Sequence, residues 1–301
     1  MQVNQRHRKG ILLAGGNGTR LHPLTIGISK HLLPVYDKPM IYYSLSLLML
    51  ADVREILVIT CPKNQSNFQD LLGDGSQWGI ELSYTVQDQP NGIAEALVIA
   101  EDFLAGSPSC LVLGDNLLYG HNLTSYLKQA SAQIEGATIL ACHVNDPSAF
   151  GVVELDENDK PISITEKPAN PTSHNAVPGI YFYDENAPAM VSKLVPSSRG
   201  ELEITDLNRL YLQQGKLDVC LLNRGFAWFD TGTHSSINEA SDFIKAIEKR
   251  MGLKIGCPEE IAYLKRWVSA ETILANVQTN PNSDYNKYLQ FMVNQNPDNH
   301  Q

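Results

Sequence analysis

Residues 10–21 read GILLAGGNGTRL, and this stretch decides the fold. Its first part, Gly10 to Ala14, is a short apolar run that stops at glycines, which is typical of a buried strand. The glycines that follow predict a tight loop whose main-chain N–H groups converge, and such a concavity binds anions. Arg20 adds a planar cation suited to phosphate oxygens, and Lys30 lies close enough in sequence to reach the same phosphates. The alternative is an ordinary turn between a strand and a helix, which the two cations make the weaker interpretation.

Outward from this loop, the first half of the chain alternates between strand and helix patterns. Apolar runs bounded by turn residues predict strands at 55–61, 82–86, 110–113 and 137–144, and helical spacing predicts helices at 40–51, 65–72, 93–104 and 123–134. Continuous apolar strands separated by helices indicate an α/β fold with a mostly parallel sheet covered on both faces.

The middle of the chain changes character. Strands at 151–155, 161–165 and 176–183 are joined by polar turns, and helices at 187–194 and 203–213 and strands at 216–222 and 226–229 follow. From residue 234 onward the pattern is mostly helical, with a loop near 256–259 and a turn-rich break at 279–285. We therefore expect a catalytic core at 1–233 with an α+β insertion at about 145–225, and a C-terminal helical extension at 234–301.

Composition excludes several classes of protein. The chain has 301 residues and a formal net charge of −10, which gives no electrostatic footprint for nucleic acid. Its five cysteines are scattered without a CxxC pair, so we interpret them as buried apolar residues, not as zinc ligands or disulfides. We expect no membrane-spanning segment, because no apolar run approaches about 20 residues. The start lacks a signal-peptide pattern, and we expect the cytoplasm.

Two further motifs lie where strands are predicted to end. Asp115 follows the run at 110–113, and the carboxyl edge of an open α/β sheet is its ligand crevice. A carboxylate there suits Mg²⁺, although an Asp that caps a loop is the alternative. Gln87 offers both an amide donor and an acceptor to a pyrimidine edge, and Gly92 permits close contact with a flat base. A polar loop with a helix cap is the alternative there.

Two better-known phosphate motifs are excluded. GGNGTR at 15–20 is not a GxGxxG dinucleotide fingerprint, and it lacks the GxxxxGK[ST] ending of a nucleotide-hydrolase loop. A dinucleotide-dependent oxidoreductase also needs an acidic residue after its second strand, where this chain has Pro62 and Lys63.

The run LAGGNGTRLHPLT at 13–25, with SKHLLPVYDKPMIYY at 29–43, resembles the signature of the sugar nucleotidylyltransferases. The likeness continues in separate motifs from about residue 9 to residue 267 and is greatest to the thymidylyl-transferring members. It implies a Rossmann-like, mixed, mainly parallel sheet between helices, with a sugar-binding insertion and a C-terminal helical part. It also implies Mg²⁺-dependent transfer of thymidylate from dTTP to glucose 1-phosphate, which gives dTDP-glucose and pyrophosphate for dTDP-deoxysugar synthesis (rhamnose or an aminosugar).

The resemblance also assigns site residues. Arg20 is assigned to the triphosphate and the transition state, Lys30 to the pyrophosphate, and Lys167 to the sugar phosphate. Asp115 and Asp230 are assigned to the metal. The remaining nucleotide contacts are Leu13, Gly15, Gly16, Gly18, Thr19, Gln87 and Gly92. The sugar-phosphate side is Asn116, Gly151, Glu166, Lys167, Val177, Gly179, Tyr181 and Trp228. The segment 199–206 matches too, and its Glu203 and Thr205 are interpreted as helix-start and structural residues.

Similar enzymes are homotetramers that the end product of the pathway inhibits at a second site between subunits. The residues that match parts of that site are Tyr119, Gly120, His121, Arg224 and Glu260. This chain departs from the family pattern there at Leu118, at Leu264 and at 282–286. Two alternatives stay open: a transferase that uses another nucleotide, such as a uridylyltransferase, and an inactive nucleotide-sugar sensor. The sensor is disfavoured because the chain keeps both cations of the first loop and both metal-site carboxylates.

Overall fold

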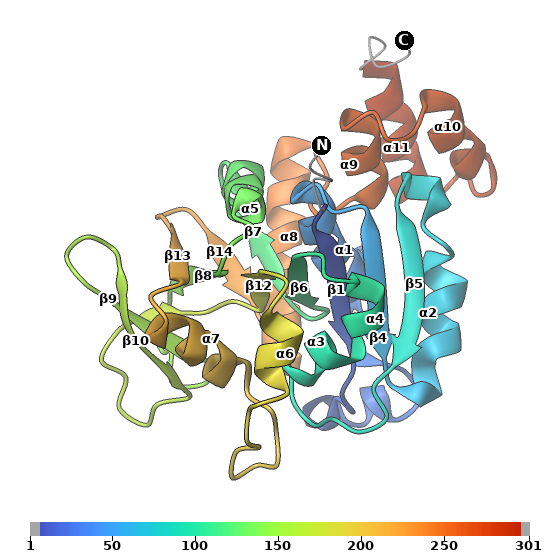
Figure 1. Ribbon diagram of the computed structural model, residues 1–301. Coiled ribbons are helices and arrows are strands. Elements are labelled where there is room, and N and C mark those ends of the chain that lie inside the picture. Colours follow the sequence, from blue (N-terminus) through green and yellow to red (C-terminus); the bar gives the residue numbers. More distant parts are fainter. Residues whose placement is uncertain (1–6, 296–301) are drawn as a thin grey trace, which may run out of the picture.

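A central mixed sheet of ten strands forms the middle layer of the protein (Figure 1). The computed structural model describes residues 7–295, so residues 1–6 and 296–301 of the two expected domains lie outside the described residues. The strand order is β10-β9-β11-β8-β12-β6-β1-β4-β5, with β13 paired to β8. The ten strands are β1 Lys9–Ala14, β4 Glu55–Thr60, β5 Glu81–Val86, β6 Ser109–Leu113, β8 Ala137–His143, β9 Gly151–Leu155, β10 Pro161–Glu166, β11 Asn175–Ala176, β12 Ile180–Tyr183 and β13 Leu217–Leu222.

Alternation along β1 explains why both faces of this sheet are covered. Leu12 and Ala14 point into one apolar cluster, and Ile11 and Leu13 point into another on the opposite face. The first cluster is covered by α1 Met40–Leu50, α2 Gln65–Leu72 and α5 Leu123–Ala132. The second is covered by α3 Glu95–Ile99, α4 Glu101–Leu104, α6 Ala187–Val191 and α7 Ile204–Gln213. This arrangement confirms the predicted α/β class.

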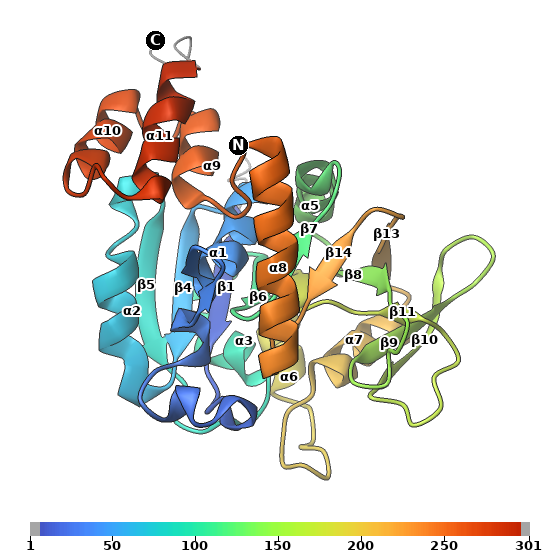
Figure 2. The ribbon, with the colours of Figure 1, turned by 180° about the vertical axis from the view of Figure 1, so that it is seen from behind.

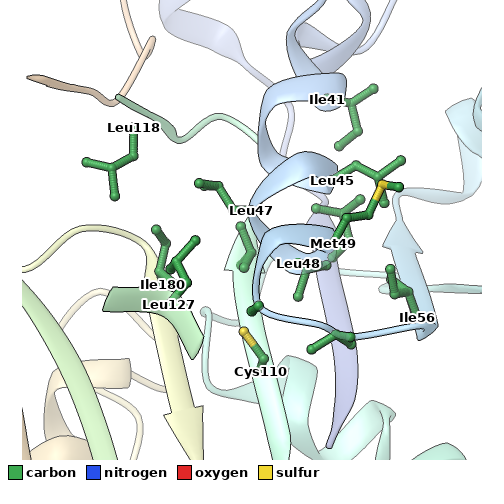
Figure 3. Packing of buried hydrophobic residues seen from close by; sticks show 14 of the residues in the cluster. Ile41, Leu45, Leu47, Leu48, Met49, Ile56, Cys110, Leu118, Leu127 and Ile180 are labelled. Atoms are coloured by element: carbon green, nitrogen blue, oxygen red, sulfur yellow. The ribbon is translucent and has the colours of Figure 1, made fainter. Parts of the chain in front are cut away.

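Helix α1 is the main covering element of the first face. Nine of its 11 residues are buried, so apolar residues surround it almost completely instead of forming one stripe. Figure 3 shows Leu45, Leu48 and Met49 of this helix packed above the sheet near Ile56. Burying one such side chain contributes about 1.5–3 kcal/mol, so we expect truncation of Leu48 to Ala to cost roughly 2–5 kcal/mol.

Parallel and antiparallel strands meet at β6. The pairs β4–β1, β1–β6 and β4–β5 are parallel, whereas β12 runs antiparallel between β6 and β8. The chain moves from β1 to β4 and β5 on one side and returns to β6 on the other side of β1. Strand order therefore reverses between β1 and β6, and in such sheets ligands bind outside the carboxyl ends of the strands at that point.

Two predicted elements are interrupted. The helix expected at 93–104 divides into α3 and α4, which meet at Ala100. The strand expected at 176–183 divides into β11 and β12, because Pro178 has no N–H for a ladder and Gly179 packs against β6. The strands of the expected insertion extend the central sheet through pairs with β8 and β6.

Among the remaining short elements, only the strand expected at 226–229 was predicted, and the others have no counterpart among the predictions. Strands β7 Leu117–Tyr119 and β14 Ala227–Phe229 form a two-stranded antiparallel ribbon in which Leu117 faces Phe229 and Tyr119 faces Ala227. Strands β2 Pro34–Val35 and β3 Lys38–Pro39 form a second small pair. Single turns of 3-10 helix are η1 Thr19–Leu21, η2 Leu24–Ile26, η3 Lys30–Leu32, η4 Pro62–Asn64 and η5 Ser76–Trp78.

The C-terminal part is helical, as expected. Helix α8 (His234–Met251) starts at a capping box in which Thr233 Oγ1 accepts from the N–H of Ser236 at 3.1 Å, and it ends at left-handed Gly252. Helices α9 Pro258–Leu264, α10 Ala270–Gln278 and α11 Asp284–Gln295 share their own apolar cluster. Figures 1 and 2 show α9–α11 at the opposite end of the sheet from the loop that follows β1. Within residues 7–295, no helix is long and apolar enough to cross a membrane.

The five cysteines are free thiols. Cys110, Cys142 and Cys257 are buried, as interpreted from the sequence, whereas Cys61 and Cys220 are half-buried. Burial raises the pKa of the Cys110 thiol to about 12.

Candidate active site

Two adjoining cavities open where strand order reverses between β1 and β6. The smaller has a volume of about 220 Å³ and the larger about 480 Å³, and Asp115 lines both. The predicted residues that line the smaller cavity are Leu13, Gly15, Gly16, Lys30, Gln87 and Gly92. Those that line the larger cavity are Arg20, Asn116, Gly151, Glu166, Lys167, Val177, Gly179, Tyr181, Trp228 and Asp230. The structure therefore brings residues from positions 13 to 230 to one continuous site.

The glycine loop after β1 is shaped by left-handed glycines and by a side-chain hydrogen bond. Gly16 and Gly18 have φ values of 88° and 56°, which lets the chain turn sharply out of the strand. The carbonyl of Gly18 accepts from Thr25 Oγ1 at 2.7 Å, which closes the loop on itself. Gly18 and Thr19 are not among the residues that line the two cavities. Within the described structure they therefore shape the loop and do not form part of a cavity wall.

Lys30 and Asp115 form an ion pair in the wall of the smaller cavity, and Asp115 also lines the larger one. Their side chains are only 15% and 17% exposed. Burial alone would raise the pKa of Asp115, but the charge of the Lys30 ammonium and the hydrogen bonds from Lys30 and Asn116 hold it below its ordinary value. His31 is buried beside them, and burial, followed by the charge of Lys30, lowers its pKa to about 3. At this point of the wall, the cation Lys30, the anion Asp115 and the neutral imidazole of His31 therefore lie side by side.

Asn116 connects three parts of the site. Its Oδ1 accepts from the N–H of Gly179 at 2.9 Å and from Nε1 of Trp228 at 2.7 Å. Because both partners are donors, the amide must turn its Nδ2 the other way, where it donates to Oδ1 of Asp115 at 3.1 Å. Asn116 and Trp228 were expected to contact the sugar phosphate. In the structure their polar atoms bind each other, so they orient Asp115 and shape the wall.

Asp230 reaches the same cavity through the β7–β14 ribbon. Asp115 lies two residues before β7 and Asp230 directly after β14, and the register that pairs Leu117 with Phe229 places both carboxylates at one end of the ribbon. A side chain at Gly232 would lie 3.2 Å from both Arg20 Nη2 and Asp230 Oδ2, so these two groups flank that glycine. The ribbon thus brings the two carboxylates to the larger cavity, which Arg20 lines from the loop after β1.

The donor set fits a hard divalent metal ion. Among the described residues, no group of three or more His, Cys, Asp or Glu side chains is placed to hold a metal. Two carboxylates on one cavity nevertheless suit an ion that takes its other ligands from phosphates and water, which is the usual arrangement for Mg²⁺.

The far end of the larger cavity carries a network of acidic and basic side chains. Thr205 Oγ1 donates to Glu166 Oε2 at 2.6 Å, and Lys167 Nζ lies 3.3 Å from Glu166 Oε1. Arg199 lies 3.7 Å from the same Glu166 Oε1 and 2.8 Å from Glu203. Helix α7 begins at Ile204, directly after Glu203, so both residues interpreted as structural are placed as expected.

Arg199, His31 and Glu201 line the cavities although the sequence analysis gave them no role in the site. Glu203 and Thr205, which were interpreted as structural, also line the larger cavity. Arg199 and Glu201 belong to the matching segment 199–206, and a guanidinium in a loop before a helix was the available signal. His31 follows Lys30 directly, but nothing in the sequence indicates that its ring is buried.

The five residues matched to a regulatory site are not among those lining the two cavities. Tyr119 ends β7 and stacks edge-on against Phe243, with ring centroids 5.7 Å apart. Gly120 packs against Phe226, where a methyl group would lie only 2.2 Å from the ring. His121 and Arg224 are exposed, and Glu260 is half-buried on α9 with a pKa raised by burial.

A doubly covered sheet with its crevice at the switch point, a glycine loop with two cations, and two carboxylates on one cavity define a nucleotide-dependent phosphate-transfer enzyme. The chain belongs to the nucleotidyl transferase family, because that family's model, described as "Nucleotidyl transferase", matches residues 9–247. Members of this family typically need a divalent metal.

Curated relatives match over almost the whole chain. Glucose-1-phosphate thymidylyltransferase of Xanthomonas campestris pv. campestris (strain B100) is 55% identical to this chain. The match spans 94% of this chain and 96% of that protein. The protein of the same name from Mycobacterium tuberculosis H37Rv is 47% identical, with 96% of this chain covering 100% of it.

Solved structures agree with this assignment. A Bacillus anthracis structure, described as a glucose-1-phosphate thymidylyltransferase in complex with sucrose, has a TM-score of 0.73 and 41% identity, over 78% of this chain and 94% of that one. UDP-glucose pyrophosphorylase bound to UDP-glucose has a TM-score of 0.71 and 25% identity, over 81% of this chain and 99% of that one.

Proposed function

We propose that this protein transfers a thymidylyl group from dTTP to α-D-glucose 1-phosphate and releases pyrophosphate, giving dTDP-glucose. The observation that carries the proposal is the continuous cavity at the switch point. It has the glycine loop at one end, Lys167 and Arg199 at the other, and the carboxylates Asp115 and Asp230 between them. The curated relatives named for this activity support the choice of substrates.

The reaction is substitution at the α-phosphorus of dTTP. A phosphate oxygen of glucose 1-phosphate attacks in line, the bond from the α-phosphorus to its bridging oxygen breaks, and pyrophosphate leaves. The nucleophile is already an anion, so the protein needs no strong general base. Its task is to hold two polyanions in contact and to stabilise the charge of the transition state.

The cations of the first loop are proposed to act on the triphosphate. Arg20 and Asp230 both lie next to Gly232. From this position the planar guanidinium can bind the α-phosphate in the ground state and in the transition state. Lys30 is proposed to take up the pyrophosphate, for which it must exchange its partner Asp115 for phosphate oxygens. Main-chain groups of Gly15 and Gly16 line the same wall.

Asp115 and Asp230 are proposed to hold Mg²⁺. When bound there, such an ion would act as a Lewis acid toward the phosphate groups. The chain's own part is to keep both carboxylates oriented. Asn116 does this for Asp115, because its amide is fixed by Trp228 and Gly179.

The acceptor end is proposed to bind the sugar and its phosphate. Lys167 and Arg199 are the cations there, and both are partly neutralised by Glu166 until an anion arrives. Glu166 can accept from sugar hydroxyls, and Thr205 fixes one of its oxygens. Gly151, Val177, Gly179 and Tyr181 complete the wall around the sugar.

The location and the assembly of the protein are a further part of the proposal. We place the protein in the cytoplasm, where nucleoside triphosphates are made, and propose a homotetramer assembled partly through residues 234–301. Large apolar side chains of that part are about half exposed: Met251 54%, Leu253 49%, Leu264 52% and Phe291 54%. Sedimentation analysis at two protein concentrations tests the assembly, and a monomer at both would contradict it.

Pyrophosphate release tests the function. Purified protein is given Mg²⁺ and glucose 1-phosphate with dTTP, UTP, CTP, ATP or GTP in turn. A strong dTTP preference that EDTA abolishes is the expected result. Faster release with another triphosphate would keep the enzyme class and overturn the thymidylyl assignment, and no release with any would favour the sensor alternative. In Arg20→Ala, kcat should fall at least 100-fold and the KM for glucose 1-phosphate should change less than about three-fold.

A further inference from the structure

The amide of Gln87, at the base end of the smaller cavity, is held by two partners of the protein itself. Its Nε2 donates to the carbonyl of Gly92 at 3.1 Å and to Oε2 of Glu95 at 2.6 Å. The side chain is 7% exposed, so water is a poor substitute for either contact. Both hydrogens of the amide are therefore used within the protein.

These two partners fix which way the amide points. A main-chain carbonyl and a carboxylate only accept hydrogen bonds, so a flipped amide would set its own oxygen against two acceptors. Glu95 is held in turn, because its other oxygen accepts from Asn91 Nδ2 at 2.9 Å. The orientation of Gln87 is thus determined by chemistry and does not depend on telling nitrogen from oxygen by position.

Only the carbonyl oxygen of Gln87 is left for a ligand. A methyl group at Gly15 would lie 3.0 Å from this Oε1, which places the oxygen against the glycine loop. Gly15 and Gln87 both line the smaller cavity. From the sequence we expected Gln87 to offer a base both a donor and an acceptor. The structure corrects this expectation, because the side chain presents only its acceptor to the cavity.

We infer that Glu95 is a positioning residue that sets base selectivity by locking Gln87 as an acceptor. A locked acceptor binds bases whose ring nitrogen at the pairing edge carries a proton, as in thymine, uracil and guanine. Cytosine and adenine present a bare ring nitrogen there, which would face the Gln87 oxygen with no proton between them. This inference rests on the proposed function, because it assumes that a nucleotide base occupies this cavity.

The test compares dUTP with dCTP, which differ only at ring positions 3 and 4. The value of kcat/KM is measured for each with glucose 1-phosphate in wild type, Glu95→Lys and Glu95→Gln. Lysine only donates, so it favours the flipped amide, whereas glutamine can still accept through its own oxygen. Glu101→Lys, at an exposed position on α4, is the matched control for the change of charge.

We expect Glu95→Lys to lower the dUTP to dCTP ratio at least ten-fold, and Glu95→Gln and Glu101→Lys to keep it within about two-fold of wild type. An unchanged ratio in active Glu95→Lys overturns the inference. If that variant is folded but inactive, its affinities for dUTP and dCTP are measured by calorimetry instead. An equal loss of affinity for both nucleotides also overturns the inference. If the variant does not fold, Glu95→Met, which only removes the acceptor, takes its place with an expected drop of about three-fold. Inactive wild type would instead contradict the proposed function.

Discussion

Lys30 and Asp115 neutralise each other in the wall of the smaller cavity, each with less than a fifth of its side chain exposed. Asp115 is proposed to bind the metal and Lys30 the phosphate. In the structure the two side chains bind each other instead. On this proposal, binding of a metal–nucleotide complex would replace one internal ion pair by two new ones. The pair leaves neither side chain as an unbalanced buried charge, which is costly.

Replacing Lys30 by Met should separate metal binding from turnover. Without the ammonium, Asp115 is free for a divalent ion, so Mn²⁺ should bind the nucleotide-free variant roughly ten-fold more tightly, as measured by electron paramagnetic resonance. The same variant should lose at least 100-fold in kcat. Lys160→Met, at a site that is 69% exposed, should change neither quantity. Unchanged Mn²⁺ affinity in Lys30→Met would show that Asp115 is not a metal ligand.

Thr205→Val should weaken acceptor binding specifically. The variant keeps the shape of the side chain but removes the hydroxyl that donates to Glu166 at 2.6 Å. A hydrogen bond to a charged group contributes about 1.5–3 kcal/mol, so the KM for glucose 1-phosphate should rise about ten-fold or more. The KM for dTTP should stay the same.

Thr138→Val is the matched control for the loss of a hydroxyl. Thr138 is buried, and in the part of the chain that the structure describes its hydroxyl has no hydrogen-bond partner. Equal effects of the two variants on the KM for glucose 1-phosphate would contradict a role of Thr205 in orienting Glu166.

Gly15→Ala should narrow the base end of the site. The new methyl group would lie 3.0 Å from Gln87 Oε1, which is closer than ordinary van der Waals contact. The KM for dTTP should rise about five- to ten-fold with little change in kcat, because a contact common to the ground and transition states is lost. Gly27→Ala adds a methyl group with nothing within 4 Å and should be silent. A normal dTTP KM in Gly15→Ala would mean that Gln87 is not held against the base.

Stability should fall in mild acid because of His31. Burial lowers its pKa to about 3, whereas in the unfolded chain it titrates near its ordinary value of 6.5. Below pH 6.5 the His31 imidazole binds a proton in the unfolded chain but stays neutral in the folded protein. The stabilisation is therefore complete above pH 6.5 and is lost as the pH falls toward 3. One pH unit below 6.5, the loss is about 1.4 kcal/mol.

Urea unfolding at pH 7.5 and 5.5, without metal or nucleotide, checks this effect. In His31→Asn the free energy of unfolding should depend on pH less than in wild type, by about 1.4 kcal/mol between these two values. His121→Asn, at an exposed position, should keep the wild-type dependence. The same pH dependence in all three proteins would refute the assignment to His31.

Much of the sheet could be predicted because its strands are short, continuous and apolar. Residues 10–14 and 55–61 lie within one residue of β1 and β4, since burial on both faces leaves no polar interruption. The strand expected at 226–229 corresponds to β14, but β7 and the pairing of the two strands could not be predicted in this way. Each strand has three residues, and they pair across more than a hundred positions, which leaves no local periodicity that indicates the pairing.

The same distinction holds for the site. Asp115 stands out because it follows the end of β6, at the edge of the sheet where ligands bind. Arg20 and Lys30 stand out because they are cations that follow a glycine-rich loop. Asp230 was assigned only by resemblance, because the ribbon that delivers it is long-range. The hydrogen bonds that orient Gln87, Asn116 and Glu166 depend on side-chain geometry, which sequence spacing does not encode.

The ribbon of β7 and β14 also bears on how this chain can evolve. Tyr119 and Ala227 are paired, so the whole excursion from 120 to 226, which carries Glu166, Lys167 and Arg199 and adds strands to the central sheet, begins and ends at adjacent backbone positions. Insertions, deletions or recombination inside that excursion can remodel the acceptor pocket while the ribbon keeps the carboxylates at 115 and 230 in register. Lineages of this fold can therefore diversify in the sugar they use and inherit the nucleotide chemistry unchanged.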